Sequence, residues 1–378
     1  MSDSPNRCSI SLQSFSSALI ITPKSSIPSG QSTDEFELIV DSDVEVDDDR
    51  GDEEDYDGES NSMSSASVSP SIYAHEFEHC RRYHSYKSGR YPLPNDTPEQ
   101  RREETLHYLA LEMNEGHVFL SGVTEWPQKI IDIGTGIGSW AIEVADMYPG
   151  ASVKGTDLSP IQPNWLPVNL RMFVEDCEGE WLHGSGFDLI HMRDVIGTLR
   201  DIPSMLEKIH NNLAPGGWVE LQDIETSIYC DDMTMSPNDA LNTFFKFATK
   251  GIQSFGLTSY PLLPSTLTLL LSQTGFTNIQ VITKKIPIAP WARDPNLAAA
   301  GVLAKEWVSE TIDAMAAKPL AILDMAVKDR KDLAGQAKRS LEKEGVHRYL
   351  RMHVVLAQRE REMSVMSDSE SYMSLGSA

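Results

Sequence analysis

Residues 129–157 read KIIDIGTGIGSWAIEVADMYPGASVKGTD, and this stretch decides the fold of the chain. Residues 129–133 form a short apolar run that ends with an acid inside it, which predicts a buried strand. Residues 139–147 place apolar side chains at helical spacing, and residues 152–156 predict a second strand. The stretch is therefore expected to fold as strand, glycine turn, helix and strand.

The turn in this unit has the composition of a ligand-binding bend. Gly134, Gly136 and Gly138 step by two after Asp132, and Asp157 closes the second strand. Glycine permits a sharp bend and a close approach of a ligand, and an acid at the next strand end can bind a ribose diol. The third glycine of the dinucleotide pattern G-x-G-x-x-G is missing, and the acid before the turn would repel a pyrophosphate. The pattern therefore favours the cationic cofactor S-adenosylmethionine (SAM) over NAD.

The net charge of −24 is unevenly distributed over the 378 residues. Residues 34–59 carry fifteen acids and one arginine, and the rest of the chain carries 41 acids against 31 bases. A chain this acidic has no bulk attraction for nucleic acid, so no direct nucleic-acid binding is expected. The four cysteines show neither metal nor disulfide spacing, and no apolar run is long enough for a signal peptide or a membrane span. We expect a soluble chain in the nucleus or the cytoplasm, with no metal site.

Residues 1–70 are rich in Ser, Asp, Glu and Pro, so we expect them to form a disordered acidic tail. Within this tail, residues 36–43 (FELIVDSD) resemble a SUMO-interacting segment, which would add a strand to the sheet of a partner. A regulatory protein partner through 36–43 is therefore a hypothesis, and an inert acidic tail is its alternative. Residues 363–378, rich in Ser and Met, are expected to form a second disordered tail.

The alternation of strand and helix patterns from 129 to 224 predicts an α/β fold with a parallel sheet and helices on both faces. Residues 71–362 are expected to form one domain, with a helical lead-in over 71–128 and a core over 129–290. A helical insertion over 296–344 and a final strand over 347–358 complete it. In the lead-in, residues 73–83 show roughly helical spacing, and a helix is expected to begin near Thr97 with Asp96 or Thr97 as its cap. Further strands are predicted at 169–174, 187–192, 218–224 and 278–286, and further helices at 203–213, 240–254 and 265–274.

Five segments make the chain resemble the class I SAM-dependent methyltransferases, and more narrowly the fungal LaeA-like group. They are GRYPLPND at 89–96, KIIDIGTGIGSWAIEVADMYP at 129–149, GTDLSPIQPNW at 155–165, FDLIHMRDVIGTLRD at 187–201 and LAPGGWVELQD at 213–223. The resemblance covers roughly residues 75–360. It implies a Rossmann-like, seven-stranded methyltransferase sheet whose last strand inserts antiparallel beside the fifth.

The same resemblance implies a set of cofactor-binding residues. The glycine turn with its preceding acid would hold the methionine moiety of SAM, and acids at the next two strand ends would contact the ribose and the adenine amino group. The end of the fourth strand would lie beneath the sulfonium. The residues concerned are Asp132, Gly134, Gly136, Gly138, Asp157, Asp176 with the adjacent Cys177, and His191, Met192 and Arg193.

Methyl transfer is an in-line displacement, in which positioning supplies much of the rate and a general base matters only if the acceptor loses a proton late. Possible bases at strand ends and in the lead-in are Tyr91, His107, His191, Glu220, Gln222 and Asp223, of which Tyr91, His191 and Gln222 are carried forward as catalytic candidates. The expected function is transfer of a methyl group from SAM to a small-molecule or protein acceptor, with a link to fungal secondary metabolism. The alternative is a regulatory subunit of a nuclear complex that retains the fold but catalyses weakly or not at all.

Overall fold

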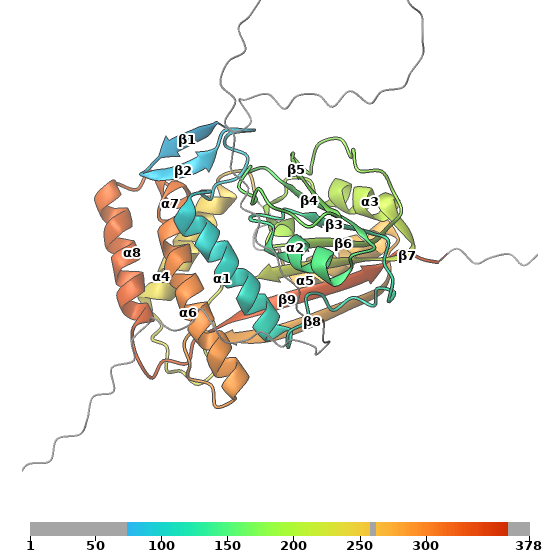
Figure 1. The fold of residues 1–378 in the computed structure, drawn as a ribbon. Coiled ribbons are helices and arrows are strands. Elements are labelled where there is room, and N and C mark those ends of the chain that lie inside the picture. The colour runs from blue at the N-terminus through green and yellow to red at the C-terminus, as the bar shows by residue number, and fades with distance from the viewer. Residues whose placement is uncertain (1–73, 258–261, 362–378) are drawn as a thin grey trace, which may run out of the picture. The chain divides into compact units, whose positions relative to one another are not determined.

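A seven-stranded sheet organises the folded part of the chain (Figure 1). The computed structural model describes residues 74–257 and 262–361, all within Ser65–Ala378, the second of the two units into which the chain divides. The acidic segment, the 36–43 motif and residues 363–378 lie outside the described residues. The strands are β3 (Lys129–Ile133), β4 (Ser152–Asp157), β5 (Leu170–Val174), β6 (Phe187–Arg193), β7 (Leu213–Ile224), β8 (Thr277–Pro287) and β9 (Tyr349–Gln358).

The strand order is β5-β4-β3-β6-β7-β9-β8. Strands β5, β4, β3, β6 and β7 pair in parallel, whereas β9 runs antiparallel to both of its neighbours. The seven-stranded fold and the antiparallel insertion of the last strand beside the fifth core strand are therefore confirmed. Because the first five strands are parallel, their carboxyl ends meet along one edge of the sheet, which is where open α/β sheets bind ligands.

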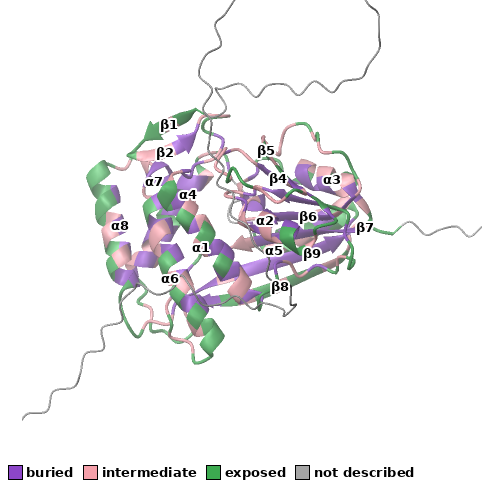
Figure 2. Ribbon diagram, in the orientation of Figure 1, coloured by how far each residue is buried: buried purple, intermediate pink, exposed green. Residues whose placement is uncertain are grey.

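Helices cover both faces of the sheet, as predicted. Neighbouring residues of one strand enter different cores: Ile130 belongs to one hydrophobic cluster and Ile131 to the other. The first cluster is built with α1 (Thr97–Met113), α2 (Ser139–Met147), α4 (Ala240–Gln253), α6 (Pro295–Met315), α7 (Lys318–Ala321) and α8 (Val327–Leu341). The second is built with α3 (Ile202–Asn212), α5 (Pro264–Thr274) and the 3-10 turn η2 (Ile196–Thr198). Figure 2 shows the resulting buried strands between partly exposed helices.

Acidic caps define where several of these helices begin. The Asp96 side chain accepts a hydrogen bond from the backbone N–H of Glu99, which confirms Asp96 as the cap of α1. Asp201 and Asp294 cap α3 and α6 in the same way, and each of these three helices has a proline in its first turn. An acid followed by a proline therefore marks where each of these three helices begins.

The lead-in departs from the sequence prediction in its first part. Residues predicted at helical spacing form a β-hairpin, with β1 (His75–Glu78) antiparallel to β2 (Arg81–His84). The two turn residues, His79 and Cys80, have φ of 52° and 62°, which is the left-handed backbone of a two-residue hairpin turn. Neither is a glycine or an asparagine, so the usual sequence signal for such a turn was missing. Helical spacing was the wrong interpretation here.

Two further boundaries were corrected. Strand β7 begins at Leu213 and not at Trp218, because Leu213 already pairs with Phe187 and the strand continues through residues 214–217. The insertion consists of three helices: α6 ends at Met315, the short α7 follows, and α8 begins at Val327.

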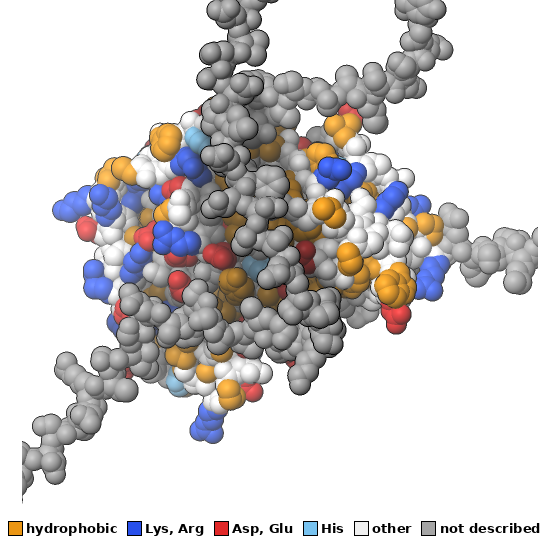
Figure 3. All heavy atoms as spheres, in the orientation of Figure 1, with side chains coloured by type: hydrophobic (Ala, Val, Ile, Leu, Met, Phe, Trp, Pro, Cys, Tyr) orange, Lys and Arg blue, Asp and Glu red, His pale blue; other side chains and the backbone are white. Residues whose placement is uncertain are grey.

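In Figure 3, Lys and Arg side chains lie along the side of the molecule that α8 occupies. No helix in the described ranges is long and apolar enough to cross a membrane.

A buried ion pair joins the insertion to the sheet and to α4. Arg348 Nη2 lies 2.6 Å from Asp239 Oδ2, and the Ser340 hydroxyl donates to the same oxygen. The other oxygen of Asp239 caps α4. The side chains of Arg348 and Asp239 are 1% and 3% exposed, so removal of either partner would leave a buried charge unpaired.

Candidate active site

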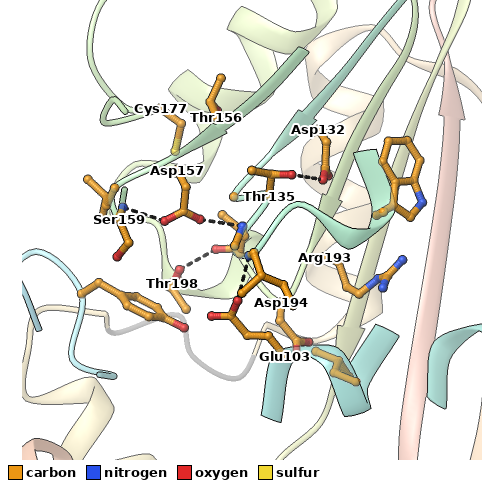
Figure 4. Close-up of a pocket in the computed structure, with 18 of the residues that line it drawn as sticks. Glu103, Asp132, Thr135, Thr156, Asp157, Ser159, Cys177, Arg193, Asp194 and Thr198 are labelled. Carbon is orange, nitrogen blue, oxygen red and sulfur yellow. Dashed lines mark hydrogen bonds between the residues drawn. The ribbon is translucent and has the colours of Figure 1, made fainter. Parts of the chain in front are cut away.

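The carboxyl ends of β3, β4, β5 and β6 line one cavity, together with α1 and the loop that precedes it. The cavity encloses about 1130 Å³ of space, part of which is open to solvent. Figure 4 shows the strand-end residues Asp132, Asp157, Cys177 and Arg193 around it, with Glu103 on the opposite side. Four strands that are separated in sequence thus place their ends around one space, as the parallel sheet requires.

The glycine turn after β3 forms one wall. The backbone N–H groups of Gly134 and Thr135 both donate to the carbonyl of Thr156, at 2.8 and 2.9 Å, which holds the turn against β4. Gly134 and Gly136 line the cavity at φ of 73° and 56°. A side chain at Gly134 would overlap Val195, and one at Gly136 would overlap the Glu103 carboxyl. Only glycine fits these two positions without strain.

Gly138 lies apart from this wall. It caps α2 at φ 87°, and its carbonyl accepts the N–H of Ile142. It is not among the residues that line the cavity, and a Cβ there would lie 2.7 Å from Met172 Cε. The third glycine of the motif therefore serves the helix start and the packing on β5.

Asp157, at the end of β4, organises the turn from the other side. Its Oδ2 accepts the N–H of Gly136 at 2.9 Å, and its Oδ1 accepts the N–H of Ser159 at 2.8 Å. Burial raises the pKa of Asp157 to about 6. The carboxyl is therefore fixed in place and is mostly ionised at pH 7.

Asp132 and His191 form a buried pair beneath the turn. Asp132 Oδ1 lies 2.7 Å from His191 Nδ1, and Asp132 Oδ2 accepts the Thr135 hydroxyl at 2.7 Å. The His191 ring stacks on Trp140 with centroids 3.9 Å apart and planes at 3°. Its Nε2 is buried and has no hydrogen-bond partner within the part of the chain that is described. Both residues line the cavity, so this nitrogen is the group of the pair that remains available to a ligand.

Asp176 and Cys177, at the end of β5, meet the loop that precedes α1. Asp176 Oδ2 lies 3.4 Å from Lys87 Nζ and 3.8 Å from Arg90 Nε, and Arg90 also pairs with Glu178. Burial raises the pKa of the Cys177 thiol to about 12, so this cysteine is neutral. Both predicted residues line the cavity, and Arg90 of the GRYPLPND segment and the preceding Lys87 bring cations to the acid that was expected to contact adenine.

Arg193 lines the cavity and is oriented by two neighbours. Its Nε donates to Gln222 Oε1 at 3.1 Å, and its Nη1 lies 3.3 Å from His107 Nδ1. His107 Nε2 lies 2.9 Å from Glu143 Oε2. Burial and the Arg193 charge lower the pKa of His107 to about 3, so its imidazole is neutral at physiological pH.

The catalytic candidate Gln222 does not reach the cavity. It is 1% exposed, and its amide donates to Glu220 Oε1 at 2.7 Å. Glu220 in turn accepts the backbone N–H groups of Leu120 and Ser121. These side chains share one face of β7, and on that face the 119–121 loop covers them. Their role is therefore to hold the lead-in on the sheet, whereas the candidates Tyr91 and His191 do line the cavity.

Sequence reasoning missed two acids of this site, Glu103 and Asp194. Glu103 Oε2 accepts the N–H of Ile137 at 3.0 Å, just after the glycine turn. Burial, with the neighbouring Glu99 and Asp157 charges, raises the pKa of Glu103 to about 8. An acid four residues after Glu99 on the same side of α1 was the available signal, but nothing local shows which way that helix face points.

Asp194 follows β6 with a left-handed backbone, at φ 55°. Its Oδ1 accepts the N–H of Ile224 at 3.2 Å, and its own N–H donates to the carbonyl of Gln222. Asp194 thereby ties the ends of β6 and β7 together at the cavity. Burial raises the pKa of its carboxyl above the usual range.

The charges of the cavity favour a cation. Its lining includes the carboxyls of Glu103, Asp132, Asp157, Glu175, Asp176 and Asp194, against the guanidinium groups of Arg90, Arg102 and Arg193. Arg102 is already paired with Glu99, and Arg90 with Glu178. A pyrophosphate would meet more carboxyl than guanidinium groups here, whereas a sulfonium and an ammonium group would be attracted.

A family model described as "Methyltransferase domain" matches residues 105–281. The methyltransferase pytC of Aspergillus terreus is 36% identical over 255 residues, which cover 67% of this chain and 78% of that protein. The secondary metabolism regulator LAE1 of Cochliobolus heterostrophus is 31% identical over 300 residues, covering 77% and 96%. The protein-methionine methyltransferase laeA of Emericella nidulans is 30% identical over 289 residues, covering 75% and 76%.

The family model covers the residues of the glycine turn and of strands β3 to β7. The chain therefore belongs to the class I SAM-dependent methyltransferases, in the fungal group that includes pytC and the LaeA regulators of secondary metabolism.

Proposed function

We propose that the cavity at the ends of β3 to β6 binds SAM and that the bound methyl group is transferred to an acceptor held beside it. The observation that carries this proposal is the convergence of Asp132, Asp157, Asp176 and His191, from four strands, on one cavity with a glycine wall. In this arrangement the turn would hold the methionine moiety, Asp157 would bind the ribose and Asp176 the adenine edge. SAM supplies an activated methyl group, and the residues of the chain orient it and exclude water.

Glu103 adds a contact from the lead-in helix. Its carboxyl lies on the Ile137 N–H and next to Gly136, so it faces the same space as the glycine wall. SAM carries a sulfonium and an ammonium group, and either would stabilise the ionised form of a buried acid. We propose that Glu103 and Asp132 together supply the negative charge that selects this cofactor.

The acceptor is either a small molecule or a protein. Relatives of this chain carry names of both kinds, since one is called a methyltransferase without a stated acceptor and another a protein-methionine methyltransferase. The regulatory alternative, in which a partner binds through residues 36–43, concerns residues outside the described part of the chain. The setting that we propose for the activity is the nucleus or the cytoplasm.

Isothermal titration calorimetry of the purified full-length chain with SAM tests the cofactor site. We expect micromolar-range binding, weakened at least ~tenfold by Gly136→Ala, because the added methyl group meets both a left-handed backbone and the Glu103 carboxyl. Gly150→Ala is the matched control, since nothing lies within 4 Å of its Cβ position. No heat of binding to the unmodified chain, or equal affinity in both glycine variants, would remove the proposal.

A further inference from the structure

A second cavity lies behind the first and meets it at four residues. It encloses about 750 Å³ of space. Residues that line both cavities mark the junction, and they are Tyr91, Arg102, Asp194 and Thr198. Neither the sequence motifs nor the relatives assign a role to this second space. A methyl group can only pass to an acceptor atom that reaches the cofactor, and these four shared residues are where the two spaces lie next to each other.

The walls of the second cavity are apolar and come from the parts of the chain outside the nucleotide-binding unit. Ile252 comes from α4, and Trp307 and Met315 come from α6 in the late insertion. Each of these three side chains is less than 5% exposed. We call this space the chamber; part of it is open to solvent and part is bounded by buried side chains, which fits a small molecule better than a segment of another folded protein.

One polar group in this chamber is unused. Trp307 Nε1 is buried and has no hydrogen-bond partner among the residues of the described ranges. An indole N–H in a buried position usually finds an acceptor, because an unpaired donor carries a desolvation cost. An oxygen atom of a bound molecule would satisfy it.

The ionisable groups of the chamber are mainly acids. Asp194, Asp223 and Glu225 line it, and the cations beside them are already engaged. The Arg102 guanidinium pairs with Glu99 at 2.7 Å, and His353 Nε2 lies 2.7 Å from Glu225 Oε1. A carboxylate or phosphate on the acceptor would therefore be buried without one of these cations to pair with, whereas a neutral hydroxyl would be accepted.

We propose, on the basis of the SAM site proposed above, that this chamber holds the methyl acceptor and that the acceptor is an uncharged, apolar small molecule with a hydroxyl group. Asp194 stands at the junction and receives the hydroxyl proton. The acceptor oxygen forms a bond to the methyl carbon while the carbon–sulfur bond breaks. The electron pair of that bond stays on sulfur, which becomes a neutral thioether, and the proton ends on the Asp194 carboxylate. Burial raises the pKa of Asp194, which makes its carboxylate a stronger base than an exposed one.

The binding test uses the full-length chain saturated with S-adenosylhomocysteine and two probes with the same ring system, 2-naphthol and 2-naphthoate. We expect 2-naphthol to bind at least ~tenfold more tightly, because the carboxylate would be buried without a cation to pair with. Met315→Trp fills the chamber and should weaken 2-naphthol binding by at least ~tenfold. Val302→Trp is the control on the same helix, since Val302 is 54% exposed and lies outside the chamber.

Two further variants separate the chemical roles. Trp307→Phe keeps the ring but removes the donor, and should weaken 2-naphthol binding about three- to tenfold. Asp194→Asn should leave 2-naphthol affinity unchanged but slow formation of 2-methoxynaphthalene by ~100-fold. The slowed rate should recover as the pH rises and naphthol ionises by itself, which a purely structural defect would not allow. Asparagine tolerates the left-handed backbone of this position.

SAM titration of the same variants distinguishes the two proposals. Failure of SAM to bind the unmodified chain counts against the cofactor site. If SAM binds normally, any one of three results overturns the acceptor proposal. These are that 2-naphthol fails to bind, that 2-naphthoate binds equally well, or that Met315→Trp has no effect on 2-naphthol binding. The acceptor proposal is also overturned, in favour of a protein acceptor, if the methyl label from SAM appears on polypeptides and not on 2-naphthol. This result should then be the same for the unmodified chain and for Met315→Trp.

Discussion

Glu103→Gln offers the sharpest test of how this site selects a cationic cofactor. Glu103 is held by the Ile137 N–H at 3.0 Å, and burial together with Glu99 and Asp157 raises its pKa to about 8. At neutral pH the carboxyl is therefore mostly protonated in the empty site. A bound cation favours the ionised form, so SAM binding should release a proton from Glu103 and should strengthen as the pH rises.

The magnitude follows from the ionised fraction. With a pKa of about 8, roughly 9% of Glu103 is ionised at pH 7 and roughly 91% at pH 9. If the ionised form is the binding form, the apparent affinity for SAM gains about tenfold over this interval. Asp157, with a pKa of about 6, is already mostly ionised at pH 7 and adds little. Glutamine has the same shape and cannot ionise, so the variant should lack this tenfold component.

The measurement is the SAM dissociation constant of both proteins at pH 7 and pH 9, by calorimetry in buffers of different ionisation enthalpy. The ratio of the two constants, variant over unmodified, should rise about tenfold between these pH values. Titration of the cofactor itself cancels in this ratio. The unmodified chain should also release about 0.9 proton more per SAM at pH 7 than the variant. A ratio that stays constant with pH, with equal proton release, would refute the role of Glu103.

Three other outcomes follow from the same contacts. Without cofactor, the raised pKa of Glu103 contributes stability that is present below pH 4.5 and is lost as the pH rises through about 8. The Tm of Glu103→Gln should therefore match that of the unmodified chain at pH 5 and exceed it at pH 9. A lower Tm of the variant at pH 9 would contradict this. Glu220→Ala leaves the Leu120 and Ser121 N–H groups unpaired and should cost about 3–5 kcal/mol of unfolding free energy. The SAM affinity of the folded fraction should change less than ~threefold. A large loss of affinity would instead place Glu220 in the site. Arg348→Ala should lower the unfolding free energy measured by urea denaturation by about 3–5 kcal/mol, because it leaves a buried carboxylate unpaired. The double variant Arg348→Met with Asp239→Asn should lose less. Equal losses in the two proteins would mean that the ion pair is not the cause.

Most of the fold could be predicted because its elements are locally encoded. The apolar strands, the helix caps at Asp96 and Asp201 and the turn at Gly134 act over a few residues, so their patterns are visible in the chain. The hairpin of His75–His84 could not, because its turn uses His79 and Cys80 in a left-handed backbone that their types do not signal.

The candidate site divides in the same way. Asp132, Asp157 and Asp176 could be named in advance, because parallel strands must bring their carboxyl ends to one edge. Gln222 lies outside the cavity lining, which the sequence could not show, since a strand-end position does not reveal whether a loop will cover that face. Glu103 was missed because its position depends on how α1 packs over the turn.

The sequence by itself therefore determined the alternation of strands and helices, the glycine wall and the preference for SAM, because apolar periodicity, glycine spacing and acids at strand ends are local patterns. Only the tertiary structure decided what surrounds that cofactor. It turned the acid of α1 toward the glycine wall, covered Glu220 and Gln222 with the 119–121 loop, and assembled a second chamber from α4 and α6. The hydrogen bonds among those contacts join residues from 34 to 100 positions apart in the sequence, and only packing brings such residues together.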